Sequence, residues 1–387
     1  MSLLAESLVF LLAAVISVPL SRRLGFGSVL GYLAAGIVIG PFGLSFVSDV
    51  EHILHFAELG VVFLLFVVGL ELKPARLWVM RHMVFGLGAL QVFLSAIAIA
   101  GVAWLFGFAG QTAIVLGLVL ALSSTAFVLQ MLAEKKQLGT VHGRAAFSVL
   151  LFQDLAAIPL IAIMPLLGAG QAAGEGLDAI GVLLMVGTIA GLILGGRLLL
   201  RPVLRIAARS EIPEIFTATA LLVVIGAALL VQAVGMSMVL GAFLAGILLA
   251  DSEYRHQLEA DIAPFKGLLL GLFFIAVGMS INISLLLGMP GRILLIVALL
   301  MATKALVLIP LGRRFGMCDR PAALKLAAVL SQGGEFAFVL FAIAKSAGTL
   351  PDPLIQEMTL AVALSMALTP LVYWLAERGS RDDELAE

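Results

Sequence analysis

The strongest constraint on this chain is a series of long, continuous apolar segments separated by charged or Gly/Pro-rich breaks. In a bilayer every backbone N–H and C=O group needs a partner within the protein, so only helices and closed barrels cross it. Barrel strands are about 10 residues long and alternate in polarity, whereas about 20 apolar residues make a helical span. The pattern predicts an all-α membrane protein with about thirteen transmembrane helices, at 3–20, 28–46, 53–72, 78–106, 112–132, 143–167, 178–200, 213–233, 236–250, 262–281, 292–312, 322–347 and 355–376.

Composition excludes the ordinary soluble classes. The chain is 62% hydrophobic and 12% charged, whereas soluble domains are about 45–50% apolar and about 25% charged. The single cysteine, Cys318, excludes a disulfide framework and a cysteine-based metal site. The first segment follows Glu6 rather than a basic stretch and has no small-residue cleavage site, which favours a membrane span over a removable signal peptide.

Basic residues predict the orientation. If the amino terminus is outside, the cytoplasmic side holds all 23 lysine and arginine residues except Arg292 and Lys345, which fall outside, and Lys304, which falls within a span. Cytoplasmic loops of membrane proteins carry this excess of positive charge. We therefore expect a multi-pass protein with its amino terminus outside and its carboxyl terminus in the cytoplasm.

Two segments about 210 residues apart resemble each other. Gly25–Ile37 and Gly235–Ile247 are identical at seven of thirteen positions, and a shorter match at a similar offset pairs Gly69 with Gly278. In the expected topology the first segment runs outward and the second inward, so the two halves of the chain are inverted. Inverted repeats are common in secondary transporters, which bind substrate near the bilayer midplane where the repeats meet.

Asp154 is the leading candidate for an ion site. It lies about ten residues into the segment 143–167, and at 1.5 Å per residue this is roughly 15 Å deep, near the midplane. Burial there favours the protonated carboxyl group, whereas a bound cation favours the carboxylate. Such a group can exchange a proton for a metal cation. The alternative is an aspartate that is locked in an ion pair and holds helices together.

Two further polar residues fall inside spans. Gln153 points about 100° away from Asp154 on a helix, so it either offers its carbonyl oxygen to the same ion or hydrogen-bonds a neighbouring helix. Lys304 lies too deep in the segment 292–312 to reach water easily, and Asp154 is its expected charge partner. A pair that opens on cation binding would belong to the mechanism, and a permanent pair would be structural.

Polar residues also interrupt two spans at matching positions of the repeat. The interruptions are Ser123, Ser124 and Thr125 in the first span, and Ser331, Gln332, Gly333, Gly334 and Glu335 in the second. Adjacent glycines destabilise a helix, and hydroxyl groups can bond the backbone groups that a break leaves free. Broken helices at equivalent positions indicate a transporter site, although the serine–threonine run alone also fits ordinary helix packing.

Five stretches together resemble one family closely. They are 27–36, 120–126, 150–159 with its Gln153-Asp154 motif, 265–274 and 331–338. The chain is similar over essentially its whole length to the Kef family, the glutathione-gated potassium-efflux members of the monovalent cation/proton antiporter superfamily.

The resemblance implies a sodium/proton-antiporter fold with a dimerisation domain and a core domain, in which the broken spans cross beside Asp154. It implies a homodimer in the plasma membrane, the inner membrane of a bacterium, whose core moves like an elevator while potassium leaves and protons enter. Asp154 would carry the cation or the proton. Around it would lie Gln153, Ser123, Ser124, Thr125 and Lys304.

The resemblance extends to a regulatory segment. Residues 254–265 resemble a cytosolic regulatory loop whose acids Glu259 and Asp261 match, although Ala263 stands where an acid is common. Kef proteins continue into a cytosolic nucleotide-binding domain, which is a possible partner together with an ancillary subunit. Here we expect a transmembrane domain over 1–376, with repeat halves of about 1–170 and 210–376, and then only a polar tail, 377–387. The chain would be a truncated form or a relative without that domain.

Two other transport functions stay open. A potassium channel needs a continuous pore and no midplane carboxylate, so proton coupling separates it from an antiporter. A sodium/proton antiporter is the other, because one carboxylate does not fix the ion. No nucleophile–base pair, metal triad, Walker A motif or His-Glu-x-x-His motif is evident, which argues against an enzyme. The expected ligands are potassium ions, protons and membrane lipid, with no resident cofactor and no nucleic acid.

Overall fold

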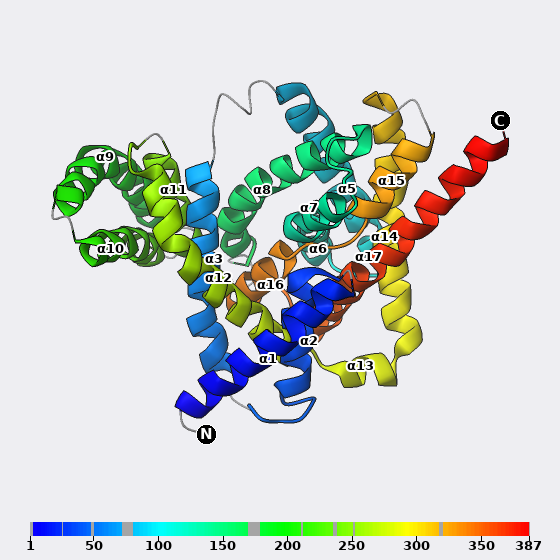
Figure 1. The fold of residues 1–387 in the computed structure, drawn as a ribbon, viewed down its shortest axis with the longest axis horizontal. Coiled ribbons are helices and arrows are strands. Elements are labelled where there is room, and N and C mark those ends of the chain that lie inside the picture. The colour runs from blue at the N-terminus through cyan, green and yellow to red at the C-terminus, as the bar shows by residue number, and fades with distance from the viewer. Residues whose placement is uncertain are drawn as a thin grey trace. The chain divides into compact units, whose positions relative to one another are not determined.

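The structure, a computed structural model, describes residues 3–24, 26–47, 50–71, 80–168, 179–209, 212–234, 238–250, 252–316 and 320–386. Within these ranges the regular structure is helical throughout, which confirms the expected all-α fold (Figure 1). The elements are α1 (Leu3–Arg23), α2 (Gly27–Ile39), α3 (Val50–Glu71), the π-helix η1 (His82–Gly88), α5 (Ala89–Leu105), α6 (Gly110–Leu120), α7 (Thr125–Glu134), α8 (Val141–Gly168), α9 (Ala179–Arg209), α10 (Pro213–Gln232), α11 (Met238–Leu249), α12 (Arg255–Ser280), α13 (Ile283–Gly288), α14 (Pro290–Arg314), α15 (Arg320–Leu330), α16 (Phe336–Ser346) and α17 (Asp352–Ala386).

Apolar helices account for all the expected spans. Six helical stretches in the described part of the chain are long and apolar enough to cross a membrane, and shorter apolar helices such as α2 and α11 accompany them. Each expected segment corresponds to one helix or to two consecutive ones. The segment 112–132 is divided into α6 and α7, and the segment 322–347 into α15 and α16. The protein is therefore a multi-pass membrane protein with two broken spans.

Local sequence sets several helix ends. Pro213 and Pro290 occupy the first turns of α10 and α14, where the missing N–H group costs no intrahelical bond. Asn282 caps α13 by accepting a hydrogen bond from the Ser284 N–H at 3.0 Å. Ser124 caps α7 in the same way, through the Phe127 N–H at 3.3 Å. The second half of a broken span thus begins at a residue suited to start a helix.

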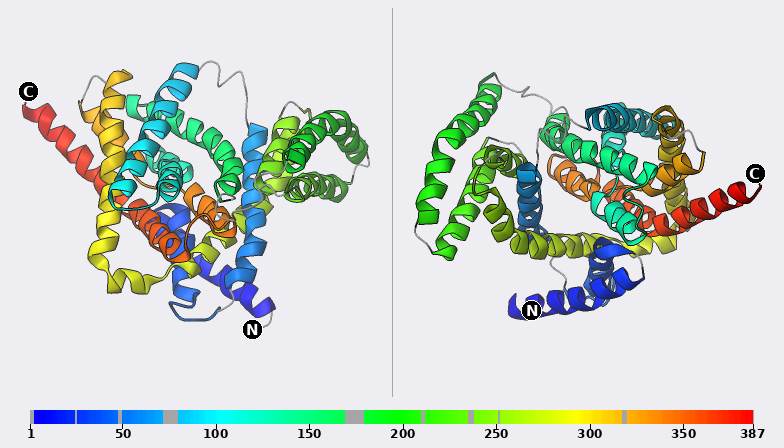
Figure 2. Two further views of the ribbon diagram at one scale, coloured as in Figure 1. Left: turned by 180° about the vertical axis from the view of Figure 1, so that it is seen from behind. Right: turned by 45° about the horizontal axis from the view of Figure 1, so that its top comes forward.

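The chain forms two compact units. Unit 1 consists of Met1–Val50, Leu77–Leu160 and Phe274–Glu387, and unit 2 of Glu51–Arg76 and Ile161–Phe273. Both expected halves of the repeat contribute to both units. In unit 2, α9, α10 and α11 pack side by side, and in unit 1, α14 packs against α15 and α17 (Figure 2).

The repeat recurs as the same close approach between helices in each unit. In unit 1, a Cβ atom placed on Gly36 of α2 would lie 2.8 Å from the Gly278 Cα atom of α12. In unit 2, a Cβ atom on Gly246 of α11 would lie 3.0 Å from the Gly69 Cα atom of α3. The sequence match pairs Gly36 with Gly246 and Gly69 with Gly278, so equivalent residues make equivalent contacts. Small residues allow membrane helices to approach this closely.

We predict that Gly36→Ala and Gly246→Ala each destabilise the protein by about 1–3 kcal/mol, because the added methyl group meets backbone atoms that cannot move aside. The measurement is the apparent melting temperature of the purified protein in detergent. Gly191→Ala in α9 is the matched control, since a Cβ atom there meets nothing within 4 Å. Equal melting of all three variants would contradict the close approach.

Candidate ion site at the crossing of two broken helices

The two breaks meet inside unit 1. Residues 121–124 separate α6 from α7, and residues 331–335 separate α15 from α16. The Ser123 hydroxyl donates a 2.7 Å hydrogen bond to the Leu330 carbonyl oxygen at the end of α15. Gly334 lies against the Ser123 backbone, and a Cβ atom on it would be only 2.6 Å from the Ser123 carbonyl carbon. Only glycine permits this approach, so Gly334 lets the two breaks cross.

The Lys304 ammonium group joins the two breaks. Its side chain reaches from α14 and is fully buried. Nζ donates to the Leu122 carbonyl oxygen at 2.8 Å, to the Ser123 hydroxyl at 2.9 Å and to the Gln332 carbonyl oxygen at 2.6 Å. These carbonyls follow the carboxyl ends of α6 and α15, where orphan C=O groups and the helix dipoles favour a cation.

The partner of Lys304 differs from the one expected from the sequence. An ammonium group has three hydrogens, and all three are directed to the oxygens of Leu122, Ser123 and Gln332 rather than to Asp154. The physical reason is that a broken span leaves main-chain carbonyl oxygens free to accept hydrogen bonds. In an intact helix these oxygens are already bonded, so a buried lysine is expected to pair with a carboxylate instead. Lys304 therefore contacts backbone and hydroxyl oxygens in the interior, not a carboxylate.

Asp154 lies on the other side of the first break. It occupies the middle of the 28-residue α8 and is half-buried. Its Oδ1 atom accepts a 2.8 Å hydrogen bond from the Thr125 hydroxyl, at the first residue of α7. The amino end of a helix carries partial positive charge and favours a nearby carboxylate. A carboxylate has about four acceptor positions, and the Thr125 hydroxyl occupies one of them.

Gln153 links the first break to α5 through its side-chain amide. Its Oε1 atom accepts the Ser123 N–H at 2.8 Å, and its Nε2 atom donates to Gln91 Oε1 at 2.7 Å. Gln91 in turn donates to the Ala121 carbonyl oxygen at 3.1 Å, just after the end of α6. Of the two roles open to Gln153, the hydrogen bond to neighbouring helices is the one present. Both amides are fully buried.

The second break has its own support. The Gly333 N–H donates a 3.0 Å hydrogen bond to the Ser365 hydroxyl of α17. Ser331, Gln332 and Glu335 are buried, and Glu335 stands at the amino end of α16. The five residues expected at the crossing, Ser331, Gln332, Gly333, Gly334 and Glu335, therefore all lie in the interior of unit 1. Glu335 is thus a second buried acid rather than a surface residue.

Sequence reasoning missed Gln91, Ser95 and Ser365. Gln91 also donates to the Ser95 hydroxyl at 3.1 Å, so α5 contributes a polar pair to the interior. A glutamine within the apolar segment 78–106 was the available signal for the first pair. Ser365 gave no comparable signal, because a serine in an apolar span commonly bonds its own helix, as it also does here with the Val362 carbonyl oxygen.

Glu259 and Asp261 lie in unit 2 on α12. The expectation of a loop at 254–265 is wrong, because the chain is helical from Arg255 onward. Charged residues mark the edge of the apolar segment there, but they favour helix and do not end it. Asp261 accepts a 2.8 Å hydrogen bond from the Thr217 hydroxyl of α10, and Glu259 Oε2 lies 4.0 Å from His256 Nδ1. A regulatory role for these acids stays a prediction.

The fold and the crossing define a class: secondary transporters with inverted repeats and two crossed broken helices. The chain belongs to the sodium/hydrogen exchanger family, since the family described as "Sodium/hydrogen exchanger, transmembrane" matches residues 9–374. It is thus a cation/proton antiporter by family, and this family is one of transporters rather than enzymes.

Solved structures agree with the family at the level of the fold. The sodium proton antiporter MjNhaP1 from Methanocaldococcus jannaschii, in a structure at pH 8, is 16% identical with a TM-score of 0.67, and the match covers 96% of each chain. An electron-microscopy map of the same antiporter gives a TM-score of 0.58 at 16% identity, covering 97% of this chain and 95% of that one.

We predict that Lys304→Met destabilises the protein by at least about 3 kcal/mol, because three buried oxygens lose their donor and each orphaned group costs roughly 1–3 kcal/mol. The matched control is Lys345→Met, which removes an exposed pair with Asp352 at 3.7 Å and should cost less than about 1 kcal/mol. Melting of the purified variants in detergent measures both. If the Lys304→Met protein is as stable as the control, the ammonium group does not stabilise the contact between the two breaks.

Proposed function

We propose that this protein exchanges potassium ions for protons at Asp154, with potassium leaving the cell as protons enter. The observation that carries the proposal is the hydrogen bond between Thr125 and Asp154, at the middle of α8 and directly after the first break. This hydrogen bond holds the Asp154 carboxylate beside the start of α7. The cation of the neighbouring crossing, the Lys304 ammonium group, already has oxygen acceptors of its own. The Gln153-Asp154 motif of the Kef family supports potassium as the ion.

The exchange follows from one carboxylate with two competing ligands. A cation needs oxygen atoms around it, and the carboxylate of Asp154 with the hydroxyl groups of Ser124 and Thr125 can supply them. A proton neutralises the same carboxylate and removes the charge that holds the cation. Asp154 therefore carries a cation or a proton, and each state of the carrier excludes the other ligand.

Ser123 and Gln153 would act one step back from the ion. The hydrogen bond between them fixes the backbone of the first break to α8. Thr125 therefore stays within reach of Asp154. Lys304 would hold the crossing together while the ion site changes its access. Alternating access by an elevator motion of the core, in a homodimer, extends this proposal to the whole transporter.

Location and regulation belong to the same proposal. The Kef resemblance supports a plasma membrane, the inner membrane in a bacterium. The distribution of lysine and arginine supports an amino terminus outside and a carboxyl terminus in the cytoplasm. The Kef resemblance supports control by a cytosolic nucleotide-binding domain and an ancillary subunit through the region of Glu259 and Asp261. Sodium/proton exchange is the second candidate, because the structurally similar antiporter carries sodium in its name.

We predict that potassium drives proton movement in proteoliposomes of the wild type, with a lower half-saturating concentration than sodium, and that Asp154→Asn abolishes it. An amide cannot carry a proton in exchange for a cation. The measurement is the fluorescence of a pH-sensitive dye inside the vesicles. Asp352→Asn is the matched control, since its carboxylate is exposed at the start of α17. Potassium flux without proton movement, equal in Asp154→Asn, would favour a channel, and a lower half-saturation for sodium would favour sodium exchange.

We predict that Thr125→Val raises the half-saturating potassium concentration at least about tenfold, because a hydrogen bond to a charged group contributes roughly 1.5–3 kcal/mol. Thr125→Ser keeps the hydroxyl group and should stay within about twofold of the wild type by the same reasoning. The same dye assay, titrated with potassium, measures both variants. If Thr125→Val keeps the half-saturating concentration of the wild type, the hydroxyl group is dispensable, and the ligand role of Thr125 fails.

A further inference from the structure

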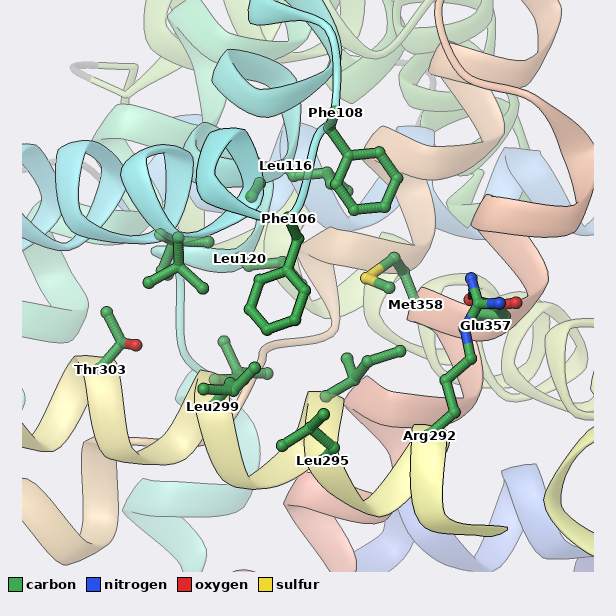
Figure 3. A pocket seen from close by; sticks show the side chains of 15 residues that line it. Phe106, Phe108, Leu116, Leu120, Arg292, Leu295, Leu299, Thr303, Glu357 and Met358 are labelled. Carbon is green, nitrogen blue, oxygen red and sulfur yellow. Dashed lines mark ion pairs between the residues drawn. The ribbon is translucent and has the colours of Figure 1, made fainter. Parts of the chain in front are cut away.

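Unit 1 contains an apolar groove that none of the crossing residues lines. Its volume is about 400 Å³, within the range of about 300–1,000 Å³ typical of ligand sites. Side chains of α5, α6, α14 and α17 line it, most of them aliphatic or aromatic (Figure 3). None of the residues assigned to the candidate ion site lines this groove.

The groove follows one face of α14. Arg292, Leu295, Leu299 and Thr303 succeed each other along it, at the spacing of one helix face (Figure 3). At 1.5 Å per residue, the distance from Arg292 to Thr303 is roughly 16 Å, about half of the hydrocarbon core of a bilayer. The groove therefore has the length of one leaflet, and an acyl chain that lies along it would be covered by apolar side chains.

Two opposite charges stand at one end of the groove. Arg292 Nη2 lies 2.9 Å from Glu357 Oε2, near the starts of α14 and α17. The arginine side chain is 55% exposed and the glutamate side chain 12% exposed. A guanidinium group has five N–H donors and a carboxylate about four acceptor positions, so this one contact leaves capacity on both residues. Phe106 and Phe108, which follow α5, also line the groove (Figure 3).

This pattern fits a zwitterionic lipid whose cation can donate hydrogen bonds. A phosphate group would accept from Arg292, and a primary ammonium group would donate to Glu357. A choline head group has no N–H to donate, and a glycerol head group brings no cation for the glutamate. The neighbouring opposite charges thus discriminate among head groups that share the same acyl chains.

We infer that this groove binds one phosphatidylethanolamine molecule, with its head group on Arg292 and Glu357 and one acyl chain along α14 toward Thr303. The lipid would pack between α14 and α6, through Leu299 and Leu120. These two helices bring Lys304 and the Leu122 carbonyl oxygen together at the crossing. The bound lipid therefore stabilises the helix pair on which the crossing depends. The inference does not rest on the proposed ion exchange.

The experiment titrates the purified, delipidated protein in detergent with phosphatidylethanolamine, phosphatidylcholine or phosphatidylglycerol of matched acyl chains. Apparent melting temperature and lipid retention in native mass spectrometry are recorded. The wild type should reach half of its stabilisation at about tenfold lower concentration of phosphatidylethanolamine than of the other two, as expected for one charge-assisted hydrogen bond. Glu357→Gln should remove this preference and leave the response to phosphatidylcholine unchanged.

One further variant tests the groove itself, and two others are controls. Leu299→Trp fills the groove and should abolish the selective stabilisation, whereas Leu306→Trp, on an exposed part of the same helix, should retain it. Arg205→Gln removes an exposed arginine paired with Glu253 in unit 2 and should also retain it. Equal stabilisation by all three lipids would overturn the inference in favour of non-selective lipid solvation. A preference for phosphatidylglycerol, or a full response in Leu299→Trp, would overturn it as well.

Discussion

The crossing depends on the hydrogen bonds between one buried charge, the Lys304 ammonium group, and the backbone of the two helix breaks. A lysine inside a membrane protein is costly unless oxygen atoms surround it, and a helix that breaks in the membrane is costly unless its carbonyl groups find donors. Lys304 and the ends of α6 and α15 meet both needs at once, through the carbonyl oxygens of Leu122 and Gln332. Neither the charge nor the breaks would be tolerable alone, so each explains why the other can exist.

This arrangement decides what Asp154 can do. A carboxylate that neutralised Lys304 would be held by a buried ion pair, and separating such a pair leaves an uncompensated charge. Here the backbone supplies the acceptors for the lysine, and Asp154 is oriented by the neutral hydroxyl of Thr125 instead. A neutral donor orients the carboxylate without bringing a charge of its own. In the proposed exchange, a cation and a proton balance the charge of this carboxylate in turn.

The sequence was informative where local chemistry decides the structure. Apolar length predicted the spans, the Gly333-Gly334 pair and the serine–threonine run predicted the breaks, and depth singled out Asp154. It was less informative where the outcome depends on which atoms a crossing brings together. The acceptors of Lys304 are main-chain oxygens, which no residue type reveals, and Gln91 matters only because it reaches the Ala121 carbonyl oxygen. The helical form of 255–265 differs from the loop that the Kef resemblance implies, because a family resemblance carries over a segment's role without its local conformation.

The repeat places a neutral residue at the position equivalent to Asp154. The offset that pairs Ala126–Leu129 with Ala337–Leu340 also pairs Asp154 with Ser365. The two residues lie at equivalent positions, each bonded to the break of its own half: Asp154 to Thr125, and Ser365 to the Gly333 N–H. Equivalent packing has therefore been kept while the chemistry has diverged. One half holds its break with a hydroxyl group and the other places a carboxylate there, so the symmetric scaffold carries one carboxylate at this pair of positions.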